Sequence, residues 1–444
     1  MATSNGKRPK RILLLCRSVF GPRMSSPGIR TRHMAEVLAA GVPDAVITLA
    51  IPTGSQPIAD PATLPYKMTT FTMKSLPKLL FAHDIIICND FPPIAMVAFP
   101  FRKFLLDYYT IYLLEWMEMS REMLAGRRKR DAWLWGSRKR IVAQLTQADM
   151  LITANDRQKD YYIGAMIALG LIDPAAYDRD PGMHHLIEPA PHGVRPDPID
   201  DGPRTPVLKG VYAGIGKDDK LIIWNGGILQ WYDPLTLLRA LAIVKEKRGD
   251  VKLAFVGGAY PGLGSMGLGQ RYQEAVELSK ELGLLNNTVF FDPTWVAYDK
   301  MKDYMREADL AVCTYFNNLE THFSLRTRFI DVFWAELPLI CTQGDVFSDM
   351  VREKQLGVVV PQEDVTAVAD AILKLVEDRP FYDECRANVR TNNAAMQWDV
   401  ALSAIVNYCR DPQSSALPKW RRTLMLAGVW TQWAAARAIG MWVR

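Results

Sequence analysis

The chain has 444 residues, more than one compact domain usually holds, so its length predicts two domains. Hydrophobic residues make up 49% of the composition and charged residues 23%, which excludes general disorder. The net charge of +5 is too small to indicate a nucleic-acid-binding protein.

The cysteine pattern and the hydropathy limit the cellular compartments in which the protein can work. None of the six cysteines forms a C-x-x-C pair, and four of them lie in apolar, strand-like runs. Reduced, buried thiols in a cytoplasmic protein therefore fit better than disulfides or a zinc site. The apolar run near the N-terminus is too short for a secretory signal, and no stretch holds about 18 uncharged apolar residues. We expect neither a signal peptide nor a membrane-spanning helix.

The first half of the chain alternates short apolar runs with helical patterns. Continuous apolar runs are typical of parallel strands buried on both faces. The runs are RILLLC at 11–16, AVITLAI at 45–51, DIIIC at 84–88, FLLDYY at 104–109 and DMLITA at 149–154. After the first run, the pattern at 29–41 predicts a helix with Gly41 as its C-cap. We expect a parallel sheet covered by helices.

The second half repeats this alternation after a segment, 188–208, that is dense in Pro, Gly and Asp and predicts a linker. Strands are expected at 221–227, 251–258, 288–292, 310–315, 337–342 and 357–361, and helices at 233–247, 271–284, 298–308 and 326–336. The sequence thus predicts an α/β protein with two Rossmann-like, doubly wound parallel-sheet domains. We place the domains at 1–200 and 206–395, with a crossover helix and an amphipathic tail at 396–444. The cleft between the domains is the expected ligand site.

Two glycine-containing turns follow strands, where open parallel sheets bind ligands. The loop from Gly21 to Gly28 follows the first strand and is succeeded by Arg30, and Gly226 and Gly227 follow the strand at 221–227. Glycine lets a ligand approach the backbone, and the free N–H groups at a helix N-terminus attract anions. Ordinary tight turns are the alternative explanation at both places.

A third glycine-rich segment matches the dinucleotide-binding pattern G-x-G-x-x-G at Gly262, Gly264 and Gly267, with Asp292 as its acid. The match is imperfect, because residues 257–261 separate the motif from its strand. The acid lies 30 residues beyond Gly262, where about 20 is usual. A glycine-rich loop explains the segment better, and an NAD-dependent oxidoreductase remains an alternative function.

The segment from Glu320 to Arg328 immediately precedes a helical pattern. Ser324 and Arg326 fall before or within its first turn, where free N–H groups and a guanidinium together suit a diphosphate. For Arg326 and Arg328, a solvent-exposed charged face is the alternative. The sequence contains no P-loop, no paired-histidine zinc motif and no G-x-S-x-G elbow.

This layout resembles the GT-B glycosyltransferases, in particular the retaining, family-4-like group with an E-x7-E signature. FSLRTRFIDVFWAELPLICTQGD, residues 323–345, is similar to the signature segment of that group. Asp331 stands in place of the second Glu and Pro338 matches a Pro, while the first Glu aligns near Phe323 or with Glu320. The pattern resembles a divergent subset, also through its GPR-x-S-x-PG-I-R loop, its WNGGI-x-x-W-x-D-P turn and its PHGV hinge.

The resemblance implies metal-independent transfer of a sugar, with retention, from a nucleotide-diphosphate donor to a glycan or lipid-linked acceptor. No cofactor is implied. Asp331 would bind the ribose, Trp295 and Val296 would border the base, and Gly226 and Gly227 would approach the donor. The diphosphate would meet Ser324, Arg326 and Thr327.

The acceptor side and the sugar involve further residues by the same resemblance. Gly21, Gly28 and Arg30 would close on the phosphates or the acceptor, and Asp90, beside Asn89, would face the acceptor. Glu320 would contact the sugar, so Asp90, Arg326 and Glu320 are the catalytic candidates. The basic pair that usually follows the glycine turn is replaced by Gln230, Trp231 and Asp233. Arg326 or Arg328 is therefore expected to supply the missing charge.

Two basic, tryptophan-bearing segments concentrate the positive charge. Residues 127–140 hold seven basic residues and one acid, and residues 419–444 hold five basic residues, four tryptophans and no acid. Such segments favour a membrane interface and anionic lipid, so we expect peripheral attachment to the inner face of the membrane and surface-glycan synthesis. A solvated helix face, or packing against protein, is the alternative. A catalytically degenerate scaffold in a membrane assembly is a further alternative function.

Overall fold

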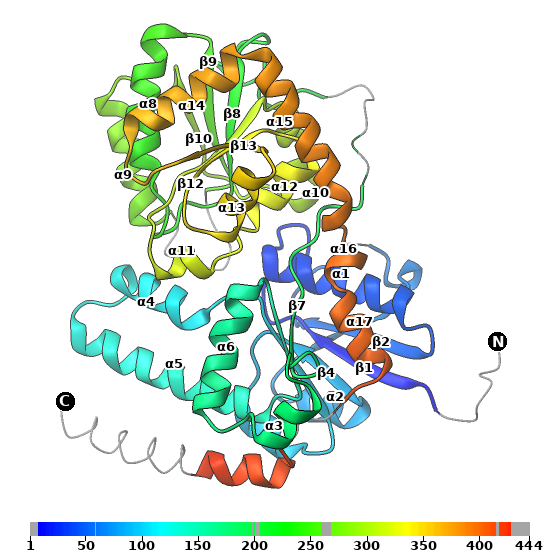
Figure 1. Ribbon diagram of the computed structural model, residues 1–444. Helices are drawn as coiled ribbons and strands as arrows, with labels where there is room; N and C mark the ends of the chain where they lie inside the picture. The colour runs from blue at the N-terminus through cyan, green and yellow to red at the C-terminus, as the bar shows by residue number, and fades with distance from the viewer. Residues whose placement is uncertain are drawn as a thin grey trace. The chain divides into compact units, whose positions relative to one another are not determined.

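The computed structural model describes residues 8–57, 59–197, 199, 205–258, 268–413 and 417–427 (Figure 1). The chain divides into two compact units. The first unit comprises Met1–Gly21, Pro27–Pro191 and Ala401–Arg444, and the second comprises Pro22–Ser26 and His192–Val400. The division falls close to the expected linker, but the start of the first βα loop belongs with the second unit.

The first unit contains a seven-stranded, all-parallel sheet in the order β3-β2-β1-β4-β5-β6-β7. Its strands are β1 Lys10–Leu15, β2 Ala45–Pro52, β3 Lys67–Phe71, β4 Ile85–Cys88, β5 Lys103–Tyr108, β6 Met150–Thr153 and β7 Ile187–Pro189. The five predicted strands are present, and their central residues are buried because helices cover both faces. The edge strands β3 and β7 were not predicted, and β7 occupies the start of the expected linker.

The helices of the first unit vary widely in length. They are α1 Ser26–Gly41, α2 Leu76–Ala82, α3 Pro93–Ala98, α4 Tyr112–Met123, α5 Arg127–Gln147, α6 Asp156–Ala168, α7 Pro174–Arg179 and α17 Ser403–Arg410. The long basic helix α5 packs beside α4 (Figure 1). Gly41 does not adopt the left-handed conformation of a C-cap. A Cβ there would lie 2.8 Å from Cγ1 of Val406, so this glycine permits the close approach of α17 instead.

The second unit contains a six-stranded, all-parallel sheet in the order β10-β9-β8-β11-β12-β13. Its strands are β8 Lys220–Asn225, β9 Val251–Val256, β10 Val289–Asp292, β11 Leu310–Cys313, β12 Leu339–Thr342 and β13 Gly357–Val360. All six were predicted from the apolar runs. The core is aromatic, with Trp224 fully buried and the rings of Phe255 and Phe291 stacked at 4.7 Å.

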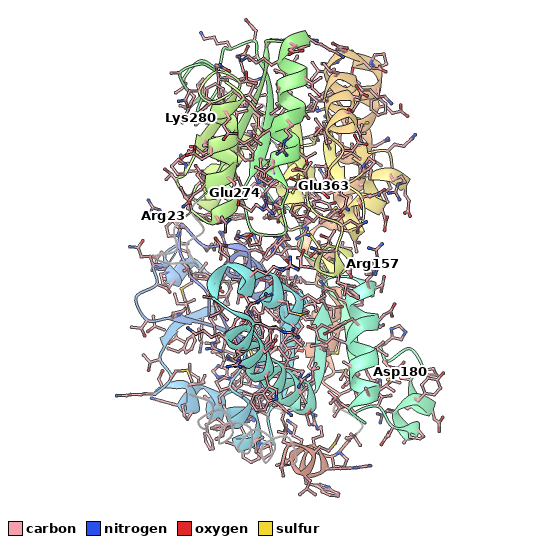
Figure 2. The ribbon with its side chains drawn as sticks, turned by 90° about the vertical axis from the view of Figure 1, so that its left-hand side faces the viewer. Arg23, Arg157, Asp180, Glu274, Lys280 and Glu363 are labelled. Carbon is pink, nitrogen blue, oxygen red and sulfur yellow. The ribbon has the colours of Figure 1, made fainter. Side chains whose placement is uncertain are left out.

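Helices α8 Pro234–Lys247 and α14 Val365–Glu377 pack together in the second unit, and α9 Gln270–Glu281 lies beside α8. Figure 2 labels Glu274 and Lys280 on α9. The remaining helices are α10 Tyr298–Met305, α11 Leu319–Phe323, α12 Arg328–Trp334, α13 Val346–Glu353, α15 Arg379–Asn392 and α16 Trp398–Ala401. The expected crossover helix is therefore two short helices, α16 and α17.

Each sheet has one topological switch point, where successive strands run to opposite sides. It lies between β1 and β4 in the first unit and between β8 and β11 in the second. Ligands of open parallel sheets bind outside the carboxyl ends of the strands at such a point. All six cysteines are free and buried, as expected. None of the helices within the described ranges is long and apolar enough to cross a bilayer.

Candidate active site

The glycine turn after β8 lies at the switch point of the second unit. Gly226 has φ of +93°, which glycine adopts without strain, and its N–H donates to the Val256 carbonyl at 2.7 Å. Nδ2 of Asn225 donates to the Arg328 carbonyl at 3.0 Å. Among the described atoms, a Cβ on Gly226 would meet only Nη2 of Arg328, at 3.9 Å. This turn and the start of α12 are thus held together.

Arg328, at the start of α12, places a positive charge beside this turn. Its Nη2 donates to the Gly227 carbonyl at 2.7 Å, and its guanidinium lies 4.0 Å from the ring centre of Tyr232 and 5.2 Å from that of Trp224. Its Nη1 is buried and has no hydrogen-bond partner among the described residues. No carboxylate in the described part of the chain forms an ion pair with Arg328. Its charge is therefore available to an anion.

Arg326, the other expected cation, is already neutralised. Its Nη1 and Nη2 donate to the two carboxylate oxygens of Glu320 at 3.0 and 2.7 Å, and Nη2 donates to Oγ1 of Thr321 at 2.9 Å. The guanidinium lies 5.2 Å from the ring centre of Tyr232 and 5.1 Å from that of Tyr315. Arg326 and Glu320 are both buried, which contradicts a solvent-exposed face for Arg326.

Ser324 and Asp345 complete this buried cluster. Oγ of Ser324 donates to Oε1 of Glu320 at 2.6 Å. Asp345 caps α13 by accepting from the Ser348 N–H at 2.7 Å, and its Oδ2 lies 3.9 Å from Nε of Arg326. Burial raises the pKa of Asp345 to about 6, although Arg326 opposes the shift. The cluster orients the loop before α12 from within the protein.

Asp331 lies in the first turn of α12, beside the glycine turn. Burial raises the pKa of Asp331 to about 6, while Arg195 and the Asn225 side chain favour the ionised form. Arg195 is buried, donates to the Tyr298 carbonyl at 2.8 Å and lies 4.0 Å from that ring. Sequence reasoning missed both Asn225 and Arg195. The only signal in the sequence was the position of each residue: Asn225 lies near the end of a predicted strand, and Arg195 directly follows the PHGV hinge.

Three other predicted donor residues lie in the second unit. Trp295 and Val296 occupy the half-buried loop between β10 and α10, and Thr327 stands at the N-cap position of α12. The same loop meets the first βα loop of the chain, because the Tyr298 N–H donates to the Pro22 carbonyl at 3.0 Å. The predicted roles of these residues stay predictions.

Arg30 is placed differently from the expectation. It is fully buried, and its Nε lies 3.0 and 2.8 Å from the two carboxylate oxygens of Asp107. Its Nη1 and Nη2 donate to the carbonyls of Pro191 and Ala190 at 2.8 and 2.7 Å. The guanidinium thus ties α1 to β5 and to the end of β7, and its hydrogen bonds go to protein atoms.

The two glycines of the first βα loop differ from each other. Gly21 has φ of +131°, and a Cβ there would lie 3.0 Å from the Gln56 carbonyl oxygen. Gly28 is buried in the first turn of α1. Gly21 therefore allows the backbone to pass close to that of Gln56. A ligand-binding role for either glycine remains a prediction.

Asp90 lies at the switch point of the first unit, beside Asn89. Its carboxylate accepts from Nη1 of Arg17 at 2.6 Å, from Nε2 of Gln144 at 2.8 Å and from Arg140. Since Arg17 follows β1 and Asp90 follows β4, this ion pair bridges the two strands of the switch point. The two arginines thus fix the Asp90 carboxylate in position.

Gly262, Gly264 and Gly267 lie outside the described residues. Within the ranges that are described, no group of three or more His, Cys, Asp or Glu side chains is arranged to hold a metal ion.

Comparison with known proteins agrees with the fold. Residues 213–392 match the family model of Glycosyl transferases group 1. A stretch of 92 residues is 34% identical to a probable sucrose-phosphate synthase of Solanum tuberosum, and it covers 20% of this chain and 8% of that protein. The chain thus aligns with only a small part of this curated relative.

Solved structures match nearly the whole chain. A sucrose-phosphate synthase from Thermosynechococcus elongatus superposes with a TM-score of 0.58 at 16% identity, covering 90% of this chain and 98% of that one. Anabaena HepE in complex with UDP and glucose gives 0.56 at 14% identity, with 90% and 99% coverage. This likeness shows the fold, which is the predicted GT-B type with two Rossmann-like units.

Proposed function

We propose that this chain, whose residues 213–392 match the family model of Glycosyl transferases group 1, is a retaining glycosyltransferase that uses a nucleotide-diphosphate sugar. The acceptor is a glycan or a lipid-linked saccharide of surface polysaccharide or glycoconjugate synthesis. The matched domain contains the glycine turn, Asp331 and Arg328. The solved HepE complex contains UDP and glucose, which supports the same class of donor here.

The observation that carries this proposal is the unpaired charge of Arg328 beside the glycine turn. Donor binding places the diphosphate against Gly226 and Gly227, with the guanidinium of Arg328 on its oxygens. Asp331 accepts hydrogen bonds from the ribose hydroxyls. The buried Arg326–Glu320 pair positions the loop that leads into α12.

The chemistry requires stabilisation of a leaving nucleoside diphosphate. When the bond between the sugar carbon and the phosphate oxygen breaks, negative charge develops on the diphosphate. A fixed guanidinium aimed at that charge lowers the barrier, and we propose that it does so without a metal ion. The Asp90 carboxylate, held by Arg17 and Arg140, serves the acceptor side.

A panel of donors tests the proposal. Purified protein is incubated with UDP-, GDP- and dTDP-sugars, with and without saccharide acceptors, and release of the nucleoside diphosphate is measured. We expect release with one nucleotide class, stimulated by an acceptor and insensitive to a chelator. Absence of both binding and release with every donor would contradict the proposal and favour the degenerate scaffold.

The raised pKa of Asp331 predicts how donor binding depends on pH. A carboxylate accepts hydrogen bonds from ribose hydroxyls more strongly than a carboxylic acid does. Affinity for the nucleotide sugar should therefore increase as the pH rises through about 6, where Asp331 ionises. Calorimetric titrations across this range should show the increase for the native chain and a flatter profile for Asp331→Asn. The intact nucleotide sugar is the right probe, because its diphosphate does not titrate there.

We also propose that the enzyme is cytoplasmic and peripheral on the inner face of the membrane. The support is the charge of the segments 127–140 and 419–444. In the described part of these segments, Arg127, Arg128, Arg138 and Arg421 are exposed. These basic side chains suit an anionic lipid surface.

A further inference from the structure

The last described helix, residues 419–427, is fixed to the first unit by a buried arginine (drawn in red in Figure 1). Arg422 is 1% exposed and donates to the carbonyls of Gln147 and Ala148, at the end of α5, at 3.1 and 2.7 Å. It also donates to Oδ1 of Asp149 at 3.0 Å, and Asp149 is fully buried. Lys419, on the same helix, also pairs with Asp149, with 3.0 Å between its Nζ and Oδ2 of Asp149. Removing Asp149 would therefore leave the buried charge of Arg422 unpaired, and this carboxylate fixes the helix to the first unit.

The outward face of this helix is apolar and basic. Trp420 is 66% exposed and Leu424 is 64% exposed. They are four residues apart, so their side chains lie on the same face. Arg421, between them in sequence, is also exposed, whereas Leu426 is buried. The helix thus turns tryptophan, arginine and leucine to the outside while Arg422 and Leu426 anchor it.

Two exposed phenylalanines adjoin the helix. Phe81 is 70% exposed and Phe101 is 69% exposed, and the guanidinium of Arg102 lies 5.7 Å from each ring centre. Nζ of Lys419 donates to the Arg102 carbonyl, which joins the helix to this aromatic pair. Phe81 precedes β4 and Phe101 precedes β5. These residues therefore lie at the amino edge of the sheet, opposite the edge where ligands bind.

The net charge around these aromatic residues is positive, although Asp84 pairs with both Arg8 and Arg102. Within the described ranges, neither Arg11 nor Arg421 has a carboxylate partner for its side chain. The sequence beyond the helix adds Arg437 and Arg444, three more tryptophans and no acid. Exposed aromatic rings beside an excess of basic side chains match a bilayer interface, where rings lie at headgroup depth and guanidinium groups meet lipid phosphates.

We propose that Phe81, Phe101, Trp420, Arg421 and Leu424 form a lipid-docking surface that binds an anionic bilayer. The proposal specifies the surface behind the peripheral attachment proposed above, and it does not depend on the catalytic assignment. The buried ion pair between Arg422 and Asp149 holds the helix at 419–427 in position on the first unit. Docking through this edge leaves the carboxyl edge of the sheet open to substrates.

Vesicle flotation of the full chain tests the docking surface. The probes are phosphatidylcholine vesicles with and without phosphatidylglycerol, and the variants are Phe81→Ser/Phe101→Ser and Arg421→Glu. We expect the native chain to float only with the anionic vesicles, and each variant to bind at least about tenfold more weakly. Ile94→Ser is the matched control, because Ile94 is 70% exposed in the first turn of α3, at the carboxyl edge of the same sheet. This control should float like the native chain.

Three outcomes would overturn the docking surface: no flotation of the native chain, equal flotation with neutral vesicles, or native-like flotation of Phe81→Ser/Phe101→Ser. Stable capture of a partner protein through the same residues, without flotation, would also overturn it. Nucleotide-sugar binding is measured in solution on the same samples. A surface variant that loses flotation but keeps donor binding separates this proposal from the catalytic one. Truncation before Lys419 is less informative, because it also removes the buried ion pair between Arg422 and Asp149.

Discussion

Replacing Arg328 with alanine should lower kcat/KM for the nucleotide-sugar donor by about 100-fold or more. Arg328 is the cation at the glycine turn that has no carboxylate partner in the described structure, and its buried Nη1 has no hydrogen-bond partner there. Its loss removes the charge that opposes the developing charge of the leaving diphosphate. The measurement is steady-state release of the nucleoside diphosphate, together with thermal unfolding to verify that the variant is folded.

Two matched variants sharpen this result. Arg328→Lys keeps the charge but loses the planar fork over Tyr232, so we expect an intermediate rate. Arg352→Ala removes an exposed arginine on α13 of the same unit and should remain close to native activity. A folded Arg328→Ala variant with native kcat/KM would show that the diphosphate lies elsewhere.

Breaking the Arg326–Glu320 pair should destabilise the protein by about 3–5 kcal/mol. Arg326→Ala leaves the buried Glu320 carboxylate without its guanidinium, and Glu320→Ala leaves Arg326 with only the more distant Asp345. Chemical denaturation of each single variant measures the loss. The double variant Glu320→Gln/Arg326→Met should lose less than the sum of the two single changes, because no buried charge is then left uncompensated.

This pair also changes how an inactive Arg326 variant is interpreted. Loss of activity in Arg326→Ala is expected even if the guanidinium never touches the donor, because the loop before α12 depends on it. Donor affinity of the folded double variant distinguishes the two roles. Retained binding with restored folding would make Arg326 a positioning residue, whereas lost binding would favour direct contact.

Much of the fold follows from local sequence pattern. Strands such as β4 and β11 are continuous apolar runs, and α8 follows Asp233, which caps it by accepting from the Thr236 N–H. The strand–turn–helix order then predicts the parallel sheets and the edge where ligands bind. The edge strands β3 and β7 were missed because β3 is polar and β7 has only three residues.

The roles of individual arginines could not be predicted in the same way. Arg30, Arg326 and Arg328 each lie near the start of a helix in the sequence. Their environments are set by partners that local pattern does not identify, such as Asp107, 77 residues from Arg30. Asp107 pairs with Arg30 and Glu320 pairs with Arg326. Of these three arginines, only Arg328 is left to bind an anion. The fold is therefore easier to predict than the residue that supplies the charge.

Hydrogen exchange of the full chain with and without a nucleotide sugar tests the central claim most directly. Donor binding should slow amide exchange in the glycine turn, at 225–232, and in the segment 319–331, since both adjoin Arg328 and Asp331. UDP-, GDP- and dTDP-sugars are compared with NAD on the same sample. Protection of these two segments by one nucleotide-sugar class, and not by NAD, is the predicted result. Protection confined to the glycine-rich residues 259–267, or protection by NAD alone, would contradict the assignment of this edge as a sugar-donor site.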